Sequence, residues 1–370
     1  MHNDTILVIV VATALAFGYT NGFHDTANTI TTMVSTRAMA PRVAVLYSAL
    51  LNFAGAFLSL EVAATVAKDF VDPSVVTPEI VFGGLIGAVA WNLATWYFGL
   101  PSSSSHALIG GLVGAVIVGV GSDGVAGENL VSKLLLPALL APTLAFIVAS
   151  VAILVAYRIV GGLSPGPVTR GYRLGQIVSG GLLSVAHGTN DAQKTMGAIT
   201  LALIANGNLG PGGDTPTWVI VSAATAIALG TYSGGWRLIK TVGARIIKMD
   251  SAQGFAAQGG GAAVILAASH FGYPLSTTHV ISGGVMGAGA AKRLSAVRWG
   301  VAGSMVAAWI LTLPAAGAMG GLAYAVARIF GANSVAGPIV VLVLVGALIG
   351  LGFASRARDA RLQAFVRVEA

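Results

Sequence analysis

The chain has 370 residues, of which 55% are hydrophobic and only 9% are charged, and it carries a net charge of +7 and no cysteine. A soluble domain carries roughly 25% charged residues, so this composition excludes an ordinary soluble globular protein. The positive charge does not indicate nucleic-acid binding, because the basic residues fall in short loops between apolar segments. The lack of cysteine excludes disulfides and thiol chemistry, and the start of the chain, without a basic region, predicts no cleaved signal peptide.

Long apolar segments follow one another along the chain. A helix needs about 20 apolar residues to cross the hydrocarbon layer, and the segments lack strand-like alternation, so we expect helices rather than a β-barrel. In chain order, single crossings are expected for residues 5–36, 43–67, 134–157, 174–206, 217–236, 299–326 and 336–355. Residues 80–121 and 252–290 would each begin and end on one side of the membrane, which predicts two helical hairpins, fully crossing or re-entrant.

The distribution of charge between these segments predicts the orientation. Lysine and arginine concentrate in the loops 37–42, 158–173, 237–250 and 291–298 and in the tail 356–370. Acidic or neutral connections are the N-terminus and residues 68–79, 122–133, 207–216 and 327–335. Because basic loops stay in the cytoplasm, we expect a multi-pass protein of the cell membrane with its N-terminus outside and its C-terminus inside.

Two sequence motifs occur twice, in the same order. The stretch NGFHDTANT (residues 21–29) aligns with HGTNDAQKT (187–195), and FGLPSSSSHALIGGLVGA (98–115) aligns with FGYPLSTTHVISGGVMGA (271–288). The expected topology sends the two copies through the membrane in opposite directions. The sequence therefore predicts an all-α, polytopic membrane transporter with two inverted-topology repeats, broken helices and two helical hairpins.

The repeat also sets the expected boundaries. We expect a first repeat over residues 1–160, a cytoplasmic linker over 161–173 and a second repeat over 174–326. An additional transmembrane helix over 336–355 and a basic cytoplasmic tail over 356–370 complete the chain.

Asp25 and Asp191 are the acidic residues that lie well inside apolar segments. An intramembrane carboxylate is costly unless it is paired or hydrated, so both are candidates for function. The neighbouring Gly and Asn residues suit a locally unwound helix whose carbonyls, with the Asp, ligate a cation. The alternative is a helix-packing ion pair with Lys194, three residues after Asp191. His24, next to Asp25, could carry a proton or make a structural hydrogen bond.

The hairpins carry hydroxyl-rich helix starts. Pro101 precedes four serines, and Pro274 precedes Ser276, Thr277 and Thr278. Hydroxyls and unpaired N–H groups gather at the positive end of a helix, and two such ends facing each other can hold a tetrahedral oxyanion; ordinary capping is the alternative. The following histidines, His106 and His279, could contact phosphate, carry a proton or satisfy a helix-terminal carbonyl.

These paired motifs resemble the inorganic phosphate transporter family, the Pit-type permeases, over nearly the whole chain. The resemblance implies a phosphate symporter in which motif Asp and Asn residues coordinate the coupling cation and hairpin Ser and Thr residues bind phosphate. Asp25 and Asn28 match the first signature, and Asn190 and Asp191 match the second. The resulting phosphate-binding candidates are Ser103, Ser104, Ser105, Ser276, Thr277, Thr278, Asn28, Thr189, Asn190, Gln193 and Lys194, and the cation candidates are Asp25, Asp191, Asn21 and His24.

The sequence departs from the family signature at His24, Gln193 and Lys194. Lys194 stands where Asn28 stands in the first copy, and a fixed ammonium there could replace one mobile cation. The second copy looks more like the bacterial low-affinity branch, which uses protons and carries metal-complexed phosphate. We therefore expect no covalent cofactor and a coupling cation that is H+ or Na+, with Mg2+ or another divalent metal entering together with phosphate as a further option.

Other functions compete with phosphate uptake. A sulfate permease would share the tetrahedral geometry, although it would make less use of the acidic acceptors, because sulfate has no proton to donate. An intramembrane aspartyl protease, Ser–His hydrolysis by Ser105 and His106, and a passive anion channel are further alternatives; we expect no enzyme. The expected partners are inorganic phosphate and the lipid bilayer, without nucleic acid, and a homodimer is left open. The phosphate hypothesis requires Asp25 and Asp191 to lie close together, near both hairpin tips.

Overall fold

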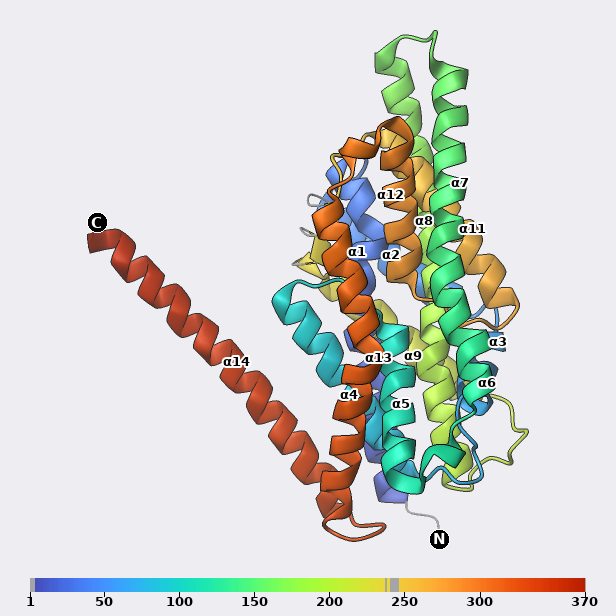
Figure 1. The fold of residues 1–370 in the computed structure, drawn as a ribbon, viewed down its shortest axis with the longest axis vertical. Coiled ribbons are helices and arrows are strands. Elements are labelled where there is room, and N and C mark those ends of the chain that lie inside the picture. The colour runs from blue at the N-terminus through green and yellow to red at the C-terminus, as the bar shows by residue number, and fades with distance from the viewer. Residues whose placement is uncertain (1–3, 237, 240–245, 370) are drawn as a thin grey trace.

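Figure 1 shows the computed structural model, which describes residues 4–236, 238–239 and 246–369. Apart from loops and one isolated β-bridge between Val71 and Val125, these residues form helices. The predicted all-α fold is therefore confirmed. Most helices run along the long axis of the molecule, whereas the last helix leans away from the body.

The first part of the chain forms α1 (Asp4–Ser35), α2 (Pro41–Gly55), α3 (Glu61–Lys68), α4 (Pro78–Phe98), α5 (Ser104–Val120), α6 (Gly127–Asn129) and α7 (Leu136–Val160), with a 3-10 turn at Ser122–Gly124 and a π-helical turn at Leu130–Leu135. The second part forms α8 (Pro165–Ala205), α9 (Thr217–Ser233), α11 (Ser251–His270), α12 (Thr277–Lys292), a 3-10 turn at Leu294–Ala296, α13 (Trp299–Arg328) and α14 (Ala336–Glu369).

Length and composition qualify several helices to cross a membrane. Among the described residues, four stretches satisfy both conditions: α1, α4, the continuous stretch from α6 to α7, and α13. Shorter apolar helices are α5, α9 and the first part of α14. The polar α8 is not among them, because its motif residues lower its hydropathy.

Both predicted hairpins are present. Helix α4 packs against α5, and α11 packs against α12. Gly99 ends α4 with a φ of 70°, and Gly272 follows α11 with a φ of 75°. A left-handed conformation favours glycine, so the same residue type makes the same turn in both hairpins.

Each hairpin packs against a helix from the other part of the chain. Helices α4 and α5 lie against α13, whereas α11 and α12 lie against α7. The helices that follow the two motif helices also pack across the two parts of the chain. Helix α2, which follows α1, packs on α8, and α9, which follows α8, packs on α1. The two parts are thus interleaved, which brings the motifs of residues 21–29 and 187–195 into one central region.

Glycines allow the closest of these approaches. A side chain on Gly110 or Gly114 in α5 would meet the carbonyl oxygen of Leu313 or Gly317 in α13. In α12, Gly283 and Gly287 lie equally close to carbonyl oxygens of α7. Small residues four positions apart let helix backbones approach where lipid provides no hydrophobic drive for association.

The apolar interior consists of two clusters. Phe17 of α1 and Met196 of α8 belong to one cluster, whereas Ile30 of α1 and Leu183 of α8 belong to the other. Both motif helices therefore pass from one cluster into the other. The polar motif residues lie at this junction.

The expected interruption of the two motif helices is not found. Helix α1 is continuous through residues 21–29, and α8 is continuous through residues 187–195. The interruptions in this region lie at the hairpin tips instead, between α4 and α5 and between α11 and α12. In a low-dielectric interior each freed backbone group needs a new partner, so an intact helix is the cheaper solution.

Three expected segments have different limits. Residues 43–67 do not form one crossing but two helices, α2 and α3, separated at residues 56–60. Helix α8 begins at Pro165, inside the expected linker, and α14 continues through the expected tail to Glu369. The amide of Gln193 caps the separate α3, since its Oε1 accepts a hydrogen bond from the Ala63 N–H, one of the unpaired donors in the first turn.

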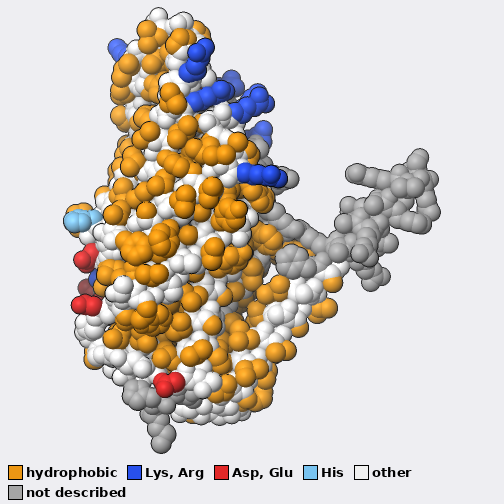
Figure 2. Space-filling view, turned by 180° about the vertical axis from the view of Figure 1, so that it is seen from behind, with side chains coloured by type: hydrophobic (Ala, Val, Ile, Leu, Met, Phe, Trp, Pro, Cys, Tyr) orange, Lys and Arg blue, Asp and Glu red, His pale blue; other side chains and the backbone are white. Residues whose placement is uncertain are grey.

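Charged side chains separate along the long axis. On the face shown in Figure 2, lysines and arginines gather toward one end and acidic side chains lie toward the other. The α7–α8 turn lies at one end of the molecule, and the start of α1 and the α13–α14 turn lie at the opposite end (Figure 1). Part of the basic loop 237–250, including Arg237, Lys240 and Arg245, lies outside the described residues.

Candidate functional site

The two motif aspartates lie together in the centre of the molecule. Asp25 of α1 and Asp191 of α8 are both fully buried. One oxygen of each carboxylate and one ring nitrogen of His187 all lie within 4.8 Å of one another. The phosphate hypothesis drawn from the sequence requires the two aspartates to lie close together, and they do.

Asp25 receives hydrogen bonds from both hairpins. The Ser104 hydroxyl, at the start of α5, donates to Asp25 Oδ2 over 2.7 Å, and the Thr278 hydroxyl of α12 donates to Oδ1 over 3.3 Å. Asn28 supports this arrangement, because its Nδ2 donates to Thr278 Oγ1 over 2.9 Å. One carboxylate thus connects a motif helix with both hairpin tips.

His24 lies beside this carboxylate. Its Nδ1 is 2.8 Å from Asp25 Oδ1, and its Nε2 is 3.2 Å from the Thr95 hydroxyl of α4 and 3.4 Å from the Ser102 hydroxyl. Ser102 in turn donates to Thr95 over 2.8 Å. His24 therefore links the acidic residue to the end of α4 in the first hairpin.

Asp191 has a basic partner. The Lys194 ammonium donates to Asp191 Oδ1 and, over 2.8 Å, to the main-chain carbonyl of Leu275 at the tip of the second hairpin. The Thr277 hydroxyl donates to Asp191 Oδ2 over 3.3 Å, and His187 Nε2 lies 3.1 Å from the same oxygen. The expected ion pair exists, and it reaches a hairpin as well as the carboxylate.

The three hydroxyls at each hairpin tip have different contacts. The first, Ser103 or Ser276, accepts a hydrogen bond from the N–H three residues later and so caps its helix. The second, Ser104 or Thr277, donates to the aspartate of its own part of the chain. The third reaches the other part of the chain, through Thr278 to Asp25. The two interpretations of the motif therefore both hold, because some of its hydroxyls cap a helix and others contact the site.

Ser105, the third hydroxyl residue of the first hairpin tip, also reaches the other part of the chain. Its hydroxyl donates to the carbonyl of Leu275 over 2.8 Å, which joins the two tips directly. The rings of His106 and His279, further along each helix, pack with their centroids 4.9 Å apart. The N-termini of α5 and α12 therefore lie side by side, and both present a positive helix end to the same region.

Charge at the site is unbalanced. Among the described residues of this cluster, two carboxylates face one ammonium, so one negative charge remains when the imidazoles are neutral. A buried charge without a partner is costly. The arrangement can therefore hold a proton or a metal ion next to the Asp25 and Asp191 carboxylates.

Several predicted residues contact neighbouring helices and main-chain carbonyls. Gln193 bonds α3 and the Thr189 carbonyl, and the Thr189 hydroxyl contacts the carbonyls of Gly55 and Val185. Asn190 Nδ2 donates to the Ser269 hydroxyl and the Tyr273 carbonyl, which ties α8 to the end of α11. None of these contacts reaches the aspartate pair.

Three further predicted residues lie near the site without a bond to it. Asn21 is buried, and neither atom of its amide has a hydrogen-bond partner among the described residues. His106 and His279 pack against each other, and His279 also packs against Trp309, at 4.1 Å between centroids. Within the described part of the chain, these histidines make no hydrogen bond to the aspartates.

His187 is the main residue of the cluster that the sequence motifs did not indicate. It lies four positions before Asp191, so both side chains occupy one helix face, and its Nδ1 is 3.2 Å from Asn52 Oδ1 in α2. The spacing His-x-x-x-Asp was visible in the sequence. Thr95, which contacts His24, carried no comparable signal, whereas Ser102, which also contacts His24, belongs to the run of four serines after Pro101.

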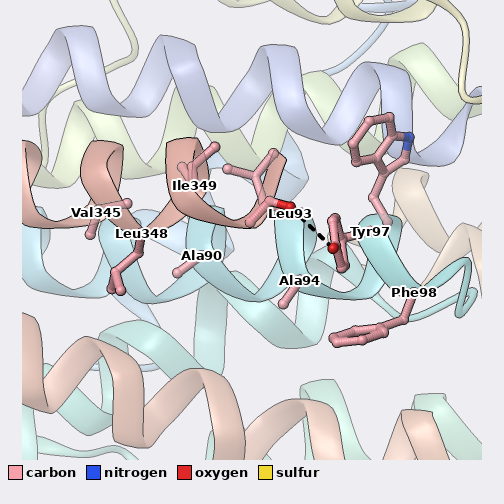
Figure 3. A pocket seen from close by; sticks show the side chains of 10 residues that line it. Ala90, Leu93, Ala94, Tyr97, Phe98, Val345, Leu348 and Ile349 are labelled. Carbon is pink, nitrogen blue, oxygen red and sulfur yellow. Dashed lines mark hydrogen bonds between the residues drawn. The ribbon is translucent and has the colours of Figure 1, made fainter. Parts of the chain in front are cut away.

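Cavities also lie away from this site. A cavity of about 510 Å3 opens at the ends of α1, α7, α8 and α11 and includes Arg37, Arg173 and Asp250. Figure 3 shows a second one, an apolar groove between α4 and α14 in which the Tyr97 hydroxyl donates to the Gly352 carbonyl over 3.2 Å. The residues that line this groove offer no charged group for an oxyanion, so its lining suits lipid chains.

Comparison with known proteins identifies the family. The model of the phosphate transporter family matches residues 21–320. A protein of Mycobacterium bovis named probable low-affinity inorganic phosphate transporter is 53% identical over 327 residues, which cover 88% of this chain and 78% of that protein. Proteins of the same name from Rhizobium meliloti and Bacillus subtilis are 46% and 43% identical; in each case 86% of this chain and 96% of the relative are covered.

A solved structure shows the same architecture. The structure titled "The sodium-dependent phosphate transporter" superposes with a TM-score of 0.79 at 25% identity, covering 88% of this chain and 99% of that one. The resemblance inferred from the paired motifs is therefore confirmed. The chain belongs to the phosphate transporter family.

Proposed function

We propose that the protein imports inorganic phosphate together with a cation, by alternating access. The observation that carries this proposal is the convergence of two hydroxyl-bearing hairpin tips on two buried aspartates, through Ser104 on Asp25 and Thr277 on Asp191. Family membership makes the chain a membrane transporter rather than an enzyme. Two contacts also speak against the enzyme alternatives: Ser105 donates to Leu275 rather than to His106, and Lys194 neutralises one aspartate of the supposed protease pair.

The geometry favours an anion at the hairpin tips. The adjoining N-termini of α5 and α12 supply positive helix ends, and the hydroxyls of Ser104 and Thr277 stand between these ends and the carboxylates. A phosphate that bound there would exchange the hydroxyl–carboxylate bonds for hydroxyl–phosphate bonds. Phosphate keeps a proton that an aspartate can accept, whereas sulfate does not, so the acidic site favours phosphate over sulfate.

The coupling cation supplies the countercharge. Importing an anion against an inside-negative potential costs about 2.3 kcal/mol per charge per 100 mV. A cation held by Asp25 cancels part of that cost. The ligand set of Asp25, His187 and Asp191 combines carboxylates with an imidazole, which suits a divalent ion as well as a proton. We favour H+, with a divalent ion entering as its phosphate complex, over Na+.

The proposed setting is the cell membrane. The basic loops would face the cytoplasm, which places the N-terminus outside and the C-terminus inside. The two hairpins, each packed on a helix of the other part of the chain, would move against the motif helices during transport, in the manner of inverted-repeat carriers.

Uptake in proteoliposomes tests the proposal. Purified protein is reconstituted, and radiolabelled phosphate uptake is measured while gradients of pH, sodium and magnesium are imposed separately, with labelled sulfate as competitor. We expect accumulation above equilibrium under a pH gradient, and stronger accumulation when Mg2+ is present. Uptake that ignores every gradient would indicate a passive channel, and preferential sulfate accumulation would indicate the sulfate alternative.

A further inference from the structure

The two motif copies differ at one aligned position. Residue 28 in the first copy is asparagine, and residue 194 in the second is lysine. Lys194 is completely buried, which is rare for a lysine. Its ammonium has two oxygen partners, one carboxylate oxygen of Asp191 and the main-chain carbonyl of Leu275.

These two partners are the ligands that a small metal cation would seek. A carboxylate from the motif helix and a carbonyl from the hairpin tip provide oxygen ligands from two elements that must come together during transport. The ammonium occupies the point where the two oxygens converge. Because an ammonium carries three N–H donors, it can also direct one toward an anion held by the hairpin tips.

The first motif copy has no lysine at the position that aligns with Lys194. Asn28 donates its amide hydrogen to Thr278 instead of contacting Asp25. Within the part of the chain that the structure describes, Asp25 has His24 as its ion-pair neighbour and neither a lysine nor an arginine. The two aspartates therefore sit in equivalent positions with different countercharges.

We propose that Lys194 is a tethered cation, which permanently fills the cation position of the second motif copy. The inference rests on the proposed phosphate uptake and makes it more specific. A carrier built this way binds its mobile cation through Asp25, and it uses one mobile cation fewer than a carrier with asparagine at both motif positions.

Removal of the ammonium should therefore create a site for a mobile ion. In Lys194→Asn the Asp191 carboxylate would lose its countercharge while one of its oxygens lies within 4.8 Å of an Asp25 oxygen. Two uncompensated buried carboxylates so close together must recruit a cation. The substitution would also introduce an amide oxygen, the group that Asn28 already carries at the aligned position of the first copy.

Sodium binding tests this directly. Purified wild type and Lys194→Asn are incubated with radioactive sodium at saturating phosphate, and bound sodium per protein is counted. The variant is expected to bind one sodium ion more than the wild type, and its phosphate uptake should become dependent on sodium. Equal sodium binding in the two proteins would overturn the proposal.

Matched variants control for the lost charge. Lys194→Arg keeps a positive charge and should bind no additional sodium, and Asp191→Asn with Lys194→Asn removes both charges and should also return sodium binding to the wild-type number. Lys292→Asn removes a lysine that pairs with Asp250 at the exposed end of α12 and should change nothing. Additional sodium bound by Lys194→Arg would contradict the proposal.

Sodium binding to the wild type alone also tests the proposal. If Lys194→Asn does not fold, the wild type is still expected to bind at most one sodium ion per protein, and two bound ions would overturn the inference. Failure of the proposed function looks different, since reconstituted wild type would then accumulate no phosphate under any gradient. The sodium count in detergent does not depend on that result.

Discussion

The carboxylates of Asp25 and Asp191, which belong to different copies of one motif, approach each other to within 4.8 Å in the interior of the protein. Two unit charges at this separation repel each other by about 3 kcal/mol at an effective dielectric constant of ~20. Lys194 offsets one of the two charges, and hydroxyls from both hairpins bond to the carboxylates. The remaining negative charge has to be balanced by something that comes from outside the chain.

Asp25→Asn should separate transport from folding. The substitution removes the uncompensated charge but keeps the shape and most hydrogen-bonding capacity, so we expect a folded protein of equal or higher thermal stability. Concentrative phosphate uptake should be lost, because nothing then holds the coupling cation. The measurements are proteoliposome uptake under a pH gradient and thermal unfolding in detergent. Undiminished accumulation would remove Asp25 from the coupling mechanism.

The serines at the first hairpin tip should behave differently from one another. Ser104 donates to Asp25, and hydrogen bonds to charged groups contribute about 1.5–3 kcal/mol. If Ser104 passes this bond to phosphate, Ser104→Ala should raise KM for phosphate by roughly tenfold or more.

Ser103→Ala is the matched control. Its hydroxyl caps α5 by accepting the His106 N–H over 3.1 Å, so its loss should cost about 1 kcal/mol of stability with little change in KM. Equal effects of the two substitutions on KM would return Ser104 to a capping role. The initial rate of uptake as a function of phosphate concentration distinguishes the outcomes.

Much of this architecture could be predicted because polar residues are rare in apolar segments. Asp25 and Asp191 stood out for that reason, and the repeat of Ser103–Ser105 as Ser276–Thr278 predicted two hairpin tips. What the repeat could not predict was how each residue divides its contacts. Only the packing of the two tips decides that Ser105 bonds the other hairpin while Ser103 caps its own helix.

The errors in the predicted elements have physical causes. Gly and Asn near Asp25 indicated an unwound helix, but in the protein interior Gly22 serves close packing against α9, and the backbone stays helical. The break at residues 56–60 was hidden because the segment there is apolar. The start of α3 after the break receives a partner from Gln193, more than a hundred residues away, which accepts the Ala63 N–H.

His187 should control the metal preference of the site. It contributes the one imidazole to a cluster otherwise made of the Asp25 and Asp191 carboxylates, and imidazole favours transition metals over Mg2+. His187→Asn, which introduces the residue type found at the aligned position 21, should weaken stimulation of phosphate uptake by Mn2+ by about tenfold and affect Mg2+ less.

A histidine distant from the site, His270, provides the control for His187→Asn. His270 ends α11 and is exposed, so His270→Asn should leave both metal responses unchanged. Uptake rates are measured against the free concentration of each metal after chelation of residual ions. An unaltered Mn2+ response in His187→Asn would show that the imidazole takes no part in holding the cation.

The packing of each hairpin against a helix from the other part of the chain should be sensitive to a single added methyl group. A Cβ on Gly114 would press on the Gly317 carbonyl of α13, and a Cβ on Gly287 would press on the Phe146 carbonyl of α7. Overpacking of this kind costs typically about 1–3 kcal/mol, so Gly114→Ala and Gly287→Ala should each lower the unfolding temperature in detergent.

Gly303→Ala separates this effect from helix propensity. Gly303 lies on α13 with open space around its Cα, so alanine there should be neutral or stabilising by up to about 1 kcal/mol. The glycines 114 and 287 occupy aligned positions in the two hairpins, and each contacts a helix from the other part of the chain, so their substitutions should destabilise to a similar degree. A stabilising Gly114→Ala would mean that α5 and α13 are too far apart for a Cβ on Gly114 to press on the Gly317 carbonyl.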